Sequence, residues 1–147
     1  PEEWRQLRAA SRVKIAGGEG CGRIQPVADA AREEMLDIYQ CDAGAFGLEQ
    51  LLAIASLAYE HGARLTPHSC NNAIGFVISL HLQLAIPNAE IQEFETFANP
   101  FVQEIFAPSF ALINGTVEVP ETPGHGFTLN EDTLRRFGIG ERVFGNW

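Results

Sequence analysis

The sequence predicts an α/β fold in which short parallel strands alternate with helices, as in a βα-barrel. Acid-base residues follow four short apolar segments, at intervals of 23, 26 and 25 residues: Glu19, Asp42, His68 and Glu93. Each interval also contains one plausible helix, so strand, loop and helix recur at the length of a βα unit. In such a barrel the carboxyl ends of successive strands converge on one mouth, where active sites are built. The spacing therefore predicts that the four side chains share one pocket.

Local signals predict each element in turn. Helix formers with an acidic first turn after Pro1 predict a helix over residues 2–10. Glycines 17–22 predict a tight loop after the first strand, and Gln25-Pro26 opens the next helix. The predicted strands are residues 13–16, 36–41, 63–66 and 89–94.

Two later helices have distinct patterns. From Leu48 the apolar residues recur at offsets of 3, 4, 7, 10 and 11, which is a helical stripe, and Gly62 supplies its end. Residues 73–82 form a helix that is apolar nearly all round, so we expect it to be buried. Asn71 or Asn72 can cap it.

The pattern changes after Phe94, where βα units cease. Residues 110–120 predict a hairpin about Asn114-Gly115, and residues 130–137 predict a short helix. We therefore predict two regions, residues 1–100 with the βα units and residues 101–147 packing as a tail.

Composition limits the partners and the compartment. The formal net charge of −9 argues against nucleic acid or an anionic membrane as a partner, because both select basic surfaces. The longest apolar run, residues 73–86, is too short to span a bilayer. Three cysteines without paired spacing indicate a reducing cytoplasm, and neither Cys41 nor Cys70 has the spacing of a zinc site.

Length carries a further expectation. A complete βα-barrel typically needs about 250 residues, whereas this chain of 147 residues shows four units, begins with Pro1 and has Met35 as its only methionine. We expect it to be the C-terminal half of a longer barrel.

Five motifs occur in the order IAGGEG, QCDAG, LTPHS, IQEFE and NGTVEVPETPGHGF. In this order and spacing they resemble the C-terminal half of the enolase superfamily, of the mandelate racemase/muconate lactonizing enzyme type, and most closely the mandelate racemase subgroup. The resemblance implies a (β/α)7β TIM-type barrel. It also implies an α+β capping domain, to which the tail from about residue 101 would return.

The resemblance also implies a site and its chemistry. Glu19 matches a Mg²⁺ ligand, Asp42 and His68 match an Asp-His dyad, and Glu93 matches the acid of the eighth strand, although Glu95 faces the same side. The family removes the proton α to a carboxylate, for which a histidine near neutral pKa is a suitable base. A cation supplies the positive charge that the enediolate needs.

These matches predict a Mg²⁺-dependent, homo-oligomeric enzyme of small carboxylates, foremost an acid-sugar dehydratase, and alternatively a racemase or epimerase of a hydroxy acid. The N-terminal half of the barrel and the capping domain, with the other metal carboxylates, are expected as missing partners. A rival interpretation is a truncated, non-catalytic half-barrel that pairs with another chain or with itself. A third is a flavodoxin-like sheet, which requires a reversal of strand order.

Overall fold

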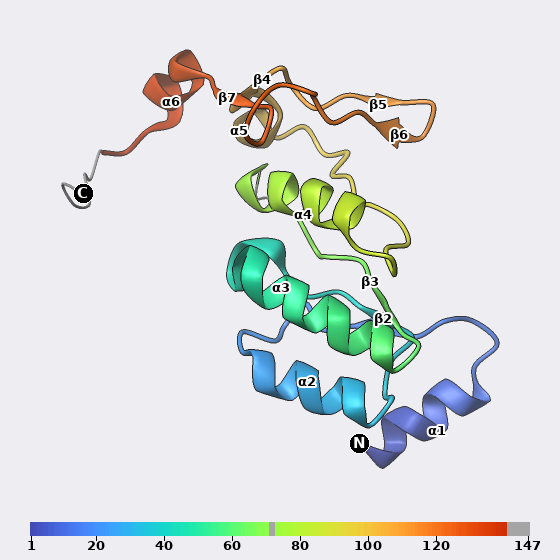
Figure 1. Ribbon diagram of the computed structural model, residues 1–147. Helices are drawn as coiled ribbons and strands as arrows, with labels where there is room; N and C mark the ends of the chain where they lie inside the picture. Colours follow the sequence, from blue (N-terminus) through green and yellow to red (C-terminus); the bar gives the residue numbers. More distant parts are fainter. Residues whose placement is uncertain (71–72, 141–147) are drawn as a thin grey trace. The chain divides into compact units, whose positions relative to one another are not determined.

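The computed structural model describes residues 1–70 and 73–140 and divides the chain into two compact units, Pro1–Glu95 and Thr96–Trp147 (Figure 1). Each unit has its own secondary structure and its own buried side chains. The division predicted at residue 100 stays a prediction. Among the described residues, no helix combines the length and the apolar character that a membrane-spanning segment needs.

The first unit alternates helices with short parallel strands. In chain order its elements are α1 (Glu2–Ala10), β1 (Ala16–Gly17), α2 (Ile24–Arg32), β2 (Ile38–Tyr39), α3 (Ala43–Glu60), β3 (Arg64–Leu65) and α4 (Ala73–Ala85). The sheet order is β1-β2-β3, and both pairs are parallel, with Ala16 opposite Ile38 and Tyr39 opposite Leu65. Consecutive strands are neighbours in this sheet, as in one arc of a barrel. The flavodoxin-like interpretation, which needs a reversal, is therefore wrong.

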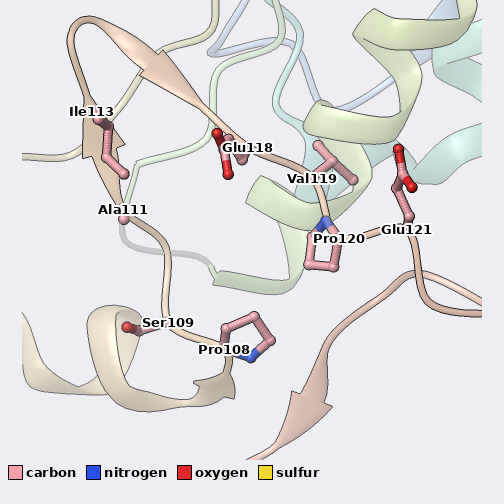
Figure 2. Close-up of a pocket in the computed structure, with 8 residues that line it drawn as sticks. All are labelled: Pro108, Ser109, Ala111, Ile113, Glu118, Val119, Pro120 and Glu121. Carbon is pink, nitrogen blue, oxygen red and sulfur yellow. The ribbon is translucent and has the colours of Figure 1, made fainter.

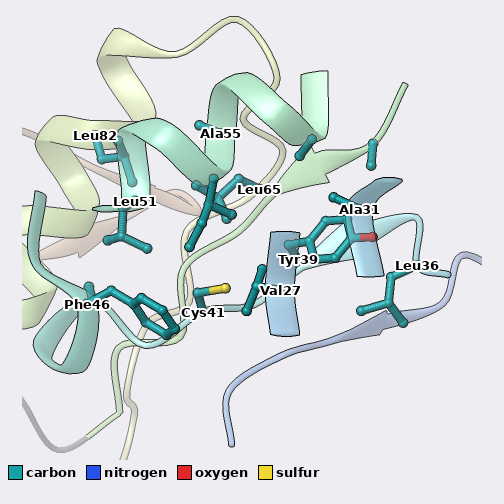
Figure 3. Close-up of a cluster of buried hydrophobic side chains, with 14 residues drawn as sticks. Val27, Ala31, Leu36, Tyr39, Cys41, Phe46, Leu51, Ala55, Leu65 and Leu82 are labelled. Carbon is teal, nitrogen blue, oxygen red and sulfur yellow. The ribbon is translucent and has the colours of Figure 1, made fainter. Parts of the chain in front are cut away.

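One face of the sheet packs against the helices. Tyr39, Cys41 and Leu65 point to this face and are 1%, 0% and 0% exposed. Figure 3 shows them within a cluster of apolar side chains to which α2, α3 and α4 also contribute: Val27, Ala31, Phe46, Leu51, Ile54, Ala55, Ala58 and Leu82. Because side chains alternate along a strand, the polar residues between the buried ones must lie on the opposite face.

That opposite face, called here the inner face, is concave. Lys14 Nζ, just before β1, lies 2.5 Å from Glu90 Oε1, beyond β3, and Arg64 Nε of β3 lies 3.6 Å from Glu90 Oε2. In a flat sheet the first and fourth strand positions would be about 14 Å apart, since neighbouring strands are spaced by about 4.8 Å. In a flat sheet both side chains would have to extend fully toward each other to meet, so their contact indicates curvature, as in a barrel wall.

The fourth predicted strand, residues 89–94, forms only its first pairing. Ala89 pairs with Leu65 in parallel, but the residues that follow join no ladder. Glu90 and Glu93 both direct their carboxylates to the inner face, although they are three residues apart. A regular strand, whose side chains repeat every two residues, cannot do this. The prediction of a regular strand through residue 94 is therefore wrong.

Helix α3 is longer than predicted. It begins at Ala43 instead of Leu48, because Asp42 caps its amino end. Gly47, with φ of 71°, interrupts the helical geometry after the first turn, so the predicted helix corresponds to the second piece. The predicted end is confirmed, since Gly62 follows the helix with φ of 70°.

Helix α4 is buried on one side only. Phe76 and Leu80 are buried, as expected for an apolar helix, but Ile74 and Leu84 are 58% and 73% exposed. The prediction of burial all round is therefore wrong for the first unit taken by itself. The cap predicted at Asn71 or Asn72 lies outside the described residues.

The second unit is built around a hairpin. Its elements are α5 (Pro100–Glu104), β4 (Phe106–Ala107), β5 (Leu112–Ile113), β6 (Thr116–Val117), β7 (Thr128–Leu129) and α6 (Glu131–Phe137). The predicted hairpin is confirmed: β5 and β6 pair antiparallel about Asn114-Gly115, whose φ angles of 52° and 79° suit a type I′ turn. The predicted helix near residue 130 is also confirmed. Helix α5 and the antiparallel pair β4–β7 were not foreseen from the sequence.

Candidate active site

The four predicted site residues all follow the strands at their carboxyl ends. Glu19 lies two residues beyond β1, Asp42 and His68 lie three residues beyond β2 and β3, and Glu93 lies beyond the pairing at Ala89. The sheet therefore places all four at one edge of the unit. Three of them make direct side-chain contact there.

His68 is the centre of this group. Its Nδ1 atom lies 3.0 Å from Glu93 Oε2 and 3.3 Å from Glu19 Oε2. The side chains of His68 and Glu93 are about a quarter to a third exposed, and that of Glu19 is 64% exposed, so the group opens to solvent. A carboxylate against Nδ1 favours the tautomer with the proton on that nitrogen. The lone pair of Nε2 is then free to accept a proton from another molecule.

Asp42 is placed differently from the expected dyad. Its carboxylate accepts from the Ala45 amide at 2.8 Å as the N-cap of α3. Asp42 and His68 are joined through their backbones, as bridge partners of neighbouring strands. In the described part of the chain the His68 ring therefore contacts glutamates and not Asp42. The physical reason is that unpaired amides at a helix start attract a carboxylate. The catalytic assignment of Asp42 stays a prediction.

Glu93 is held at both of its carboxylate oxygens. Gln40 Nε2 donates to Oε1 at 2.8 Å, and the Ser69 amide donates to Oε2 at 3.3 Å, beside the His68 contact. The sequence did not identify Gln40 as a site residue. A signal was present, because Gln40 precedes Asp42 by two residues and so lies on the same face of the chain.

Gln92 joins the site to helix α4. Its amide oxygen accepts from Ser79 Oγ at 2.8 Å and Gln83 Nε2 at 2.6 Å. Its amide nitrogen donates to Ser69 Oγ at 3.1 Å and to the Glu93 carbonyl at 2.7 Å. The bonds to Ser69, Ser79 and Gln83 link separate segments of the chain, so no local sequence pattern predicts them.

A complete metal site is not found in the described residues. No group of three or more His, Cys, Asp and Glu side chains there is arranged to hold a metal ion. Glu19 fits Mg²⁺ as one ligand, since the ion prefers carboxylate oxygens and Glu19 is exposed beside the other acid-base residues. The remaining protein ligands would have to come from outside the described residues.

Cys41 belongs to the core and not to the site chemistry. Burial, assisted by the neighbouring Cys21, raises the pKa of the Cys41 thiol to about 12. The thiol is therefore protonated near neutral pH, whereas a metal or an electrophile requires the thiolate. This removes the remaining argument for a zinc site beside Asp42.

The second unit has a separate hollow of about 670 Å³ beside its hairpin (Figure 2). Apolar side chains, one hydroxyl and two carboxylates line it: Pro108, Ser109, Ala111, Ile113, Glu118, Val119, Pro120 and Glu121. None of the predicted site residues lies in this hollow. The acid-base group of the first unit is therefore the candidate active site.

Comparison with known proteins agrees with this fold. A family model described as Enolase C-terminal domain-like matches residues 1–133. The chain belongs to this family. The predicted membership of the enolase superfamily, and the predicted C-terminal part of its barrel, are thereby confirmed.

Relatives of known activity include two kinds of enzyme. A D-galactarolactone cycloisomerase of Agrobacterium fabrum is 30% identical over 145 residues, covering 92% of this chain and 38% of the relative. A D-galactonate dehydratase family member of Streptomyces bingchenggensis is 30% identical, covering 92% and 34%. An arabinonate dehydratase of Saccharolobus solfataricus is 28% identical, covering 85% and 34%. The enolase C-terminal domain-like chain therefore spans about a third of the length of these relatives.

Solved structures of the superfamily share the fold. An enolase from Pantoea ananatis with bound D-gluconate and Mg matches with a TM-score of 0.81 at 27% identity, covering 92% of this chain and 33% of that one. A putative mandelate racemase from Bordetella bronchiseptica, complexed with 2-oxoglutarate/phosphate, matches with a TM-score of 0.86 at 30% identity, covering 96% and 38%. The parallel arc of the first unit is thus part of a superfamily barrel.

Proposed function

We propose that this chain supplies the general base and one metal ligand of a Mg²⁺-dependent acid-sugar dehydratase. The observation that carries the proposal is the position of His68, with its Nδ1 against two carboxylates at the carboxyl edge of the sheet. Family membership and the dehydratases among the relatives support the reaction class. The substrate class is a small hydroxylated carboxylate.

In this proposal His68 removes the proton α to the substrate carboxylate. The carboxylates of Glu93 and Glu19 keep the proton on Nδ1, so that Nε2 is the atom that accepts. They also stabilise the imidazolium that forms when Nε2 is protonated. The exposure of the ring, about one quarter, lets a substrate reach it.

Water loss then completes the reaction. The electrons of the α C–H bond form a carbon–carbon double bond as the bond to the β-hydroxyl breaks, and the imidazolium of His68 returns a proton to the leaving hydroxyl. The role of Glu93 as a hydrogen-bond donor to the enediolate, which the family resemblance implies, stays a prediction. The enol product becomes a 2-oxo acid in solution.

Glu19 would be this chain's ligand to Mg²⁺, together with carboxylates from outside it. When bound, the ion supplies the positive charge that stabilises a doubly charged enediolate. Two features of Glu19 support this assignment. Its side chain offers carboxylate oxygens, which Mg²⁺ prefers, and it is the most exposed of the three side chains that are in contact.

A second candidate is cycloisomerisation, favoured by the relative that carries this activity at 30% identity. The first half of the reaction would be the same removal of an α-proton by His68. The bond that breaks next would be to a ring oxygen instead of a hydroxyl, so the product would be an isomer of the substrate. Racemisation stays a prediction, since it requires a second base that faces His68.

The test is a Mg²⁺-dependent assay of the polypeptide that carries this chain, on a panel of aldonic acids, aldaric acids and their lactones. Mass spectrometry distinguishes loss of one water from isomerisation, and chelation with EDTA should abolish either. His68→Asn should lower turnover by about 10²–10⁴-fold, as expected for loss of a general base.

His61→Asn is the matched control, because His61 ends helix α3 at the amino side of β3, away from the carboxyl edge. It should leave turnover unchanged. The proposal is overturned if purified protein with Mg²⁺ converts none of these acids, or if His68→Asn and His61→Asn are equally active.

A further inference from the structure

Glu93 occupies a segment whose backbone does little to orient it. The pairing of this segment with β3 ends at Ala89, so Glu93 lacks the ladder that holds residues of a regular strand. Its position depends on side-chain bonds. Gln92 Nε2 donates a hydrogen bond to the backbone carbonyl of Glu93 at 2.7 Å. Gln40 Nε2 donates one to the carboxylate oxygen Oε1 at 2.8 Å.

Gln40 is well placed for this task. It directly follows β2, and its backbone N–H donates to the carbonyl of Gly17 in β1 at 2.7 Å. Its backbone is therefore fixed by the sheet, and its side chain reaches a carboxylate 53 residues further along the chain. The amide nitrogen must face Glu93, because the alternative orientation would set an amide oxygen against a carboxylate oxygen.

This bond decides which oxygen of Glu93 faces His68. An amide nitrogen can only donate, so Oε1 of Glu93 accepts from Gln40. The carboxylate is therefore held with its other oxygen, Oε2, toward the ring. That oxygen is the one 3.0 Å from His68 Nδ1.

We propose that Gln40 is a positioning residue of the active site, which orients the Glu93 carboxylate so that Oε2 faces His68. This inference rests on the proposed function, since it assigns Gln40 a role in that reaction. Gln40 acts through Glu93, and the structure gives it no direct part in proton removal.

The kinetic test compares Gln40→Met with Gln6→Met in the assay described above. Methionine has nearly the length of glutamine and no donor, so the first change removes the bond to Oε1. Loss of a residue that only orients a site carboxylate should lower kcat by about 10–100-fold. KM should stay within about twofold, because Gln40 does not touch substrate. Gln6 is a matched control: on α1 its side chain also donates to a carboxylate, Glu2 Oε1 at 3.1 Å, but at an exposed position outside the site, so the change should leave kcat within about twofold.

A spectroscopic test reads the contact without any turnover. The glutamine side chains are labelled with ¹⁵N, and the resonance that disappears in Gln40→Met belongs to the Gln40 side-chain amide. Glu93→Gln should shift this resonance. Glu19→Gln, which removes a carboxylate that contacts His68 but not Gln40, should leave it in place. If Gln40→Met fails to fold, selective comparison of Glu93→Gln and Glu19→Gln in the native Gln40 background still tests the bond.

The two proposals fail in different ways. An inactive native protein overturns the proposed function, whatever the spectra show. An active native protein in which Gln40→Met keeps full kcat, or loses no more than Gln6→Met, overturns the role of Gln40 alone. A Gln40 amide resonance that is indifferent to Glu93→Gln also overturns it.

Discussion

At both ends of its sheet, the first unit joins the β1 region to the segment beyond β3 through side chains of the inner face. At the amino end, Glu90 lies between Lys14 and Arg64, so two cations face one carboxylate. At the carboxyl end, Glu19 and Glu93 lie against one imidazole. The first arrangement sets opposite charges against each other, and the second has an excess of negative charge.

The difference separates a stabilising contact from a functional one. Carboxylates gathered around one ring repel each other, so the carboxyl end contributes less to stability than the same contacts with balanced charge would. Proteins keep such arrangements mainly where a substrate or a cation uses them. Variants at the amino end should therefore change folding, and variants at the carboxyl end should change chemistry.

The largest effect after His68→Asn is expected for Glu19→Gln. Losing a carboxylate ligand should lower metal affinity by about 10–100-fold or more, and turnover at limiting Mg²⁺ should fall by the same factor. Stability should hardly change, because the Glu19 side chain is 64% exposed. A Mg²⁺ titration of the rate, together with thermal unfolding, measures both.

Glu118→Gln in the second unit is the control for the loss of one negative charge. It should leave the Mg²⁺ dependence unchanged. An identical Mg²⁺ titration curve for Glu19→Gln and the native protein would contradict the assignment of Glu19.

At the amino end, the largest effect should come from Asn88→Leu. Asn88 is buried, and its amide donates to the carbonyls of Ala55 at 3.0 Å and Ala63 at 3.1 Å. Leucine has similar size but leaves two buried carbonyls without this donor, which should cost about 2 kcal/mol of unfolding free energy. Urea unfolding gives the value, and Gln103→Met, at an exposed position, should cost little.

Glu90→Gln should have a smaller effect on stability. The side chains of Lys14 and Arg64 are each 49% exposed, so solvent screens both ion pairs, and the loss should stay below about 1 kcal/mol. The difference from the native protein should shrink further at about 1 M salt. Turnover should not change, and a tenfold fall would contradict the division between the two ends.

The smallest effect concerns pH. Burial alone would raise the pKa of Asp37, but hydrogen bonds from the Ile15 amide and the Arg8 guanidinium, with the charges of Arg8 and Lys14, outweigh it and lower that pKa. A lowered pKa in the folded state means that Asp37 stabilises the fold above its unfolded value near 3.8 and loses this contribution as pH falls below it.

Asp37→Asn should therefore be less stable than the native protein near neutral pH, by about 1 kcal/mol or less, and the difference should close in acid. Unfolding curves at several pH values would show it. A difference that grows as pH falls would reverse the sign and contradict the pKa direction.

Much of the arc followed from periodic signals in the sequence. The recurrence of strand, loop and helix placed Glu19, Asp42 and His68 just beyond β1, β2 and β3, and Asn114-Gly115 marked the hairpin. These features depend on residues close together in the chain, where propensity and alternation act.

One error arose where a segment serves two partners. Residues 89–94 alternate like a strand, but bonds to both ends of the inner face draw Glu90 and Glu93 to the same side. There the local pattern lost to side-chain bonds that the pattern does not contain. Asp42 has the spacing of a catalytic partner and also caps α3 through its carboxylate, so its catalytic assignment stays a prediction.

The sequence by itself determined which residue types reach the carboxyl edge of the sheet, because chain alternation and unit length act along the backbone. Only the tertiary structure decided which of them touch. The curvature of the sheet brings Gln40 to Glu93, and Glu19 to His68, across strands that are not neighbours. Curvature is a property of packed strands and helices together, so no single stretch of the sequence specifies it.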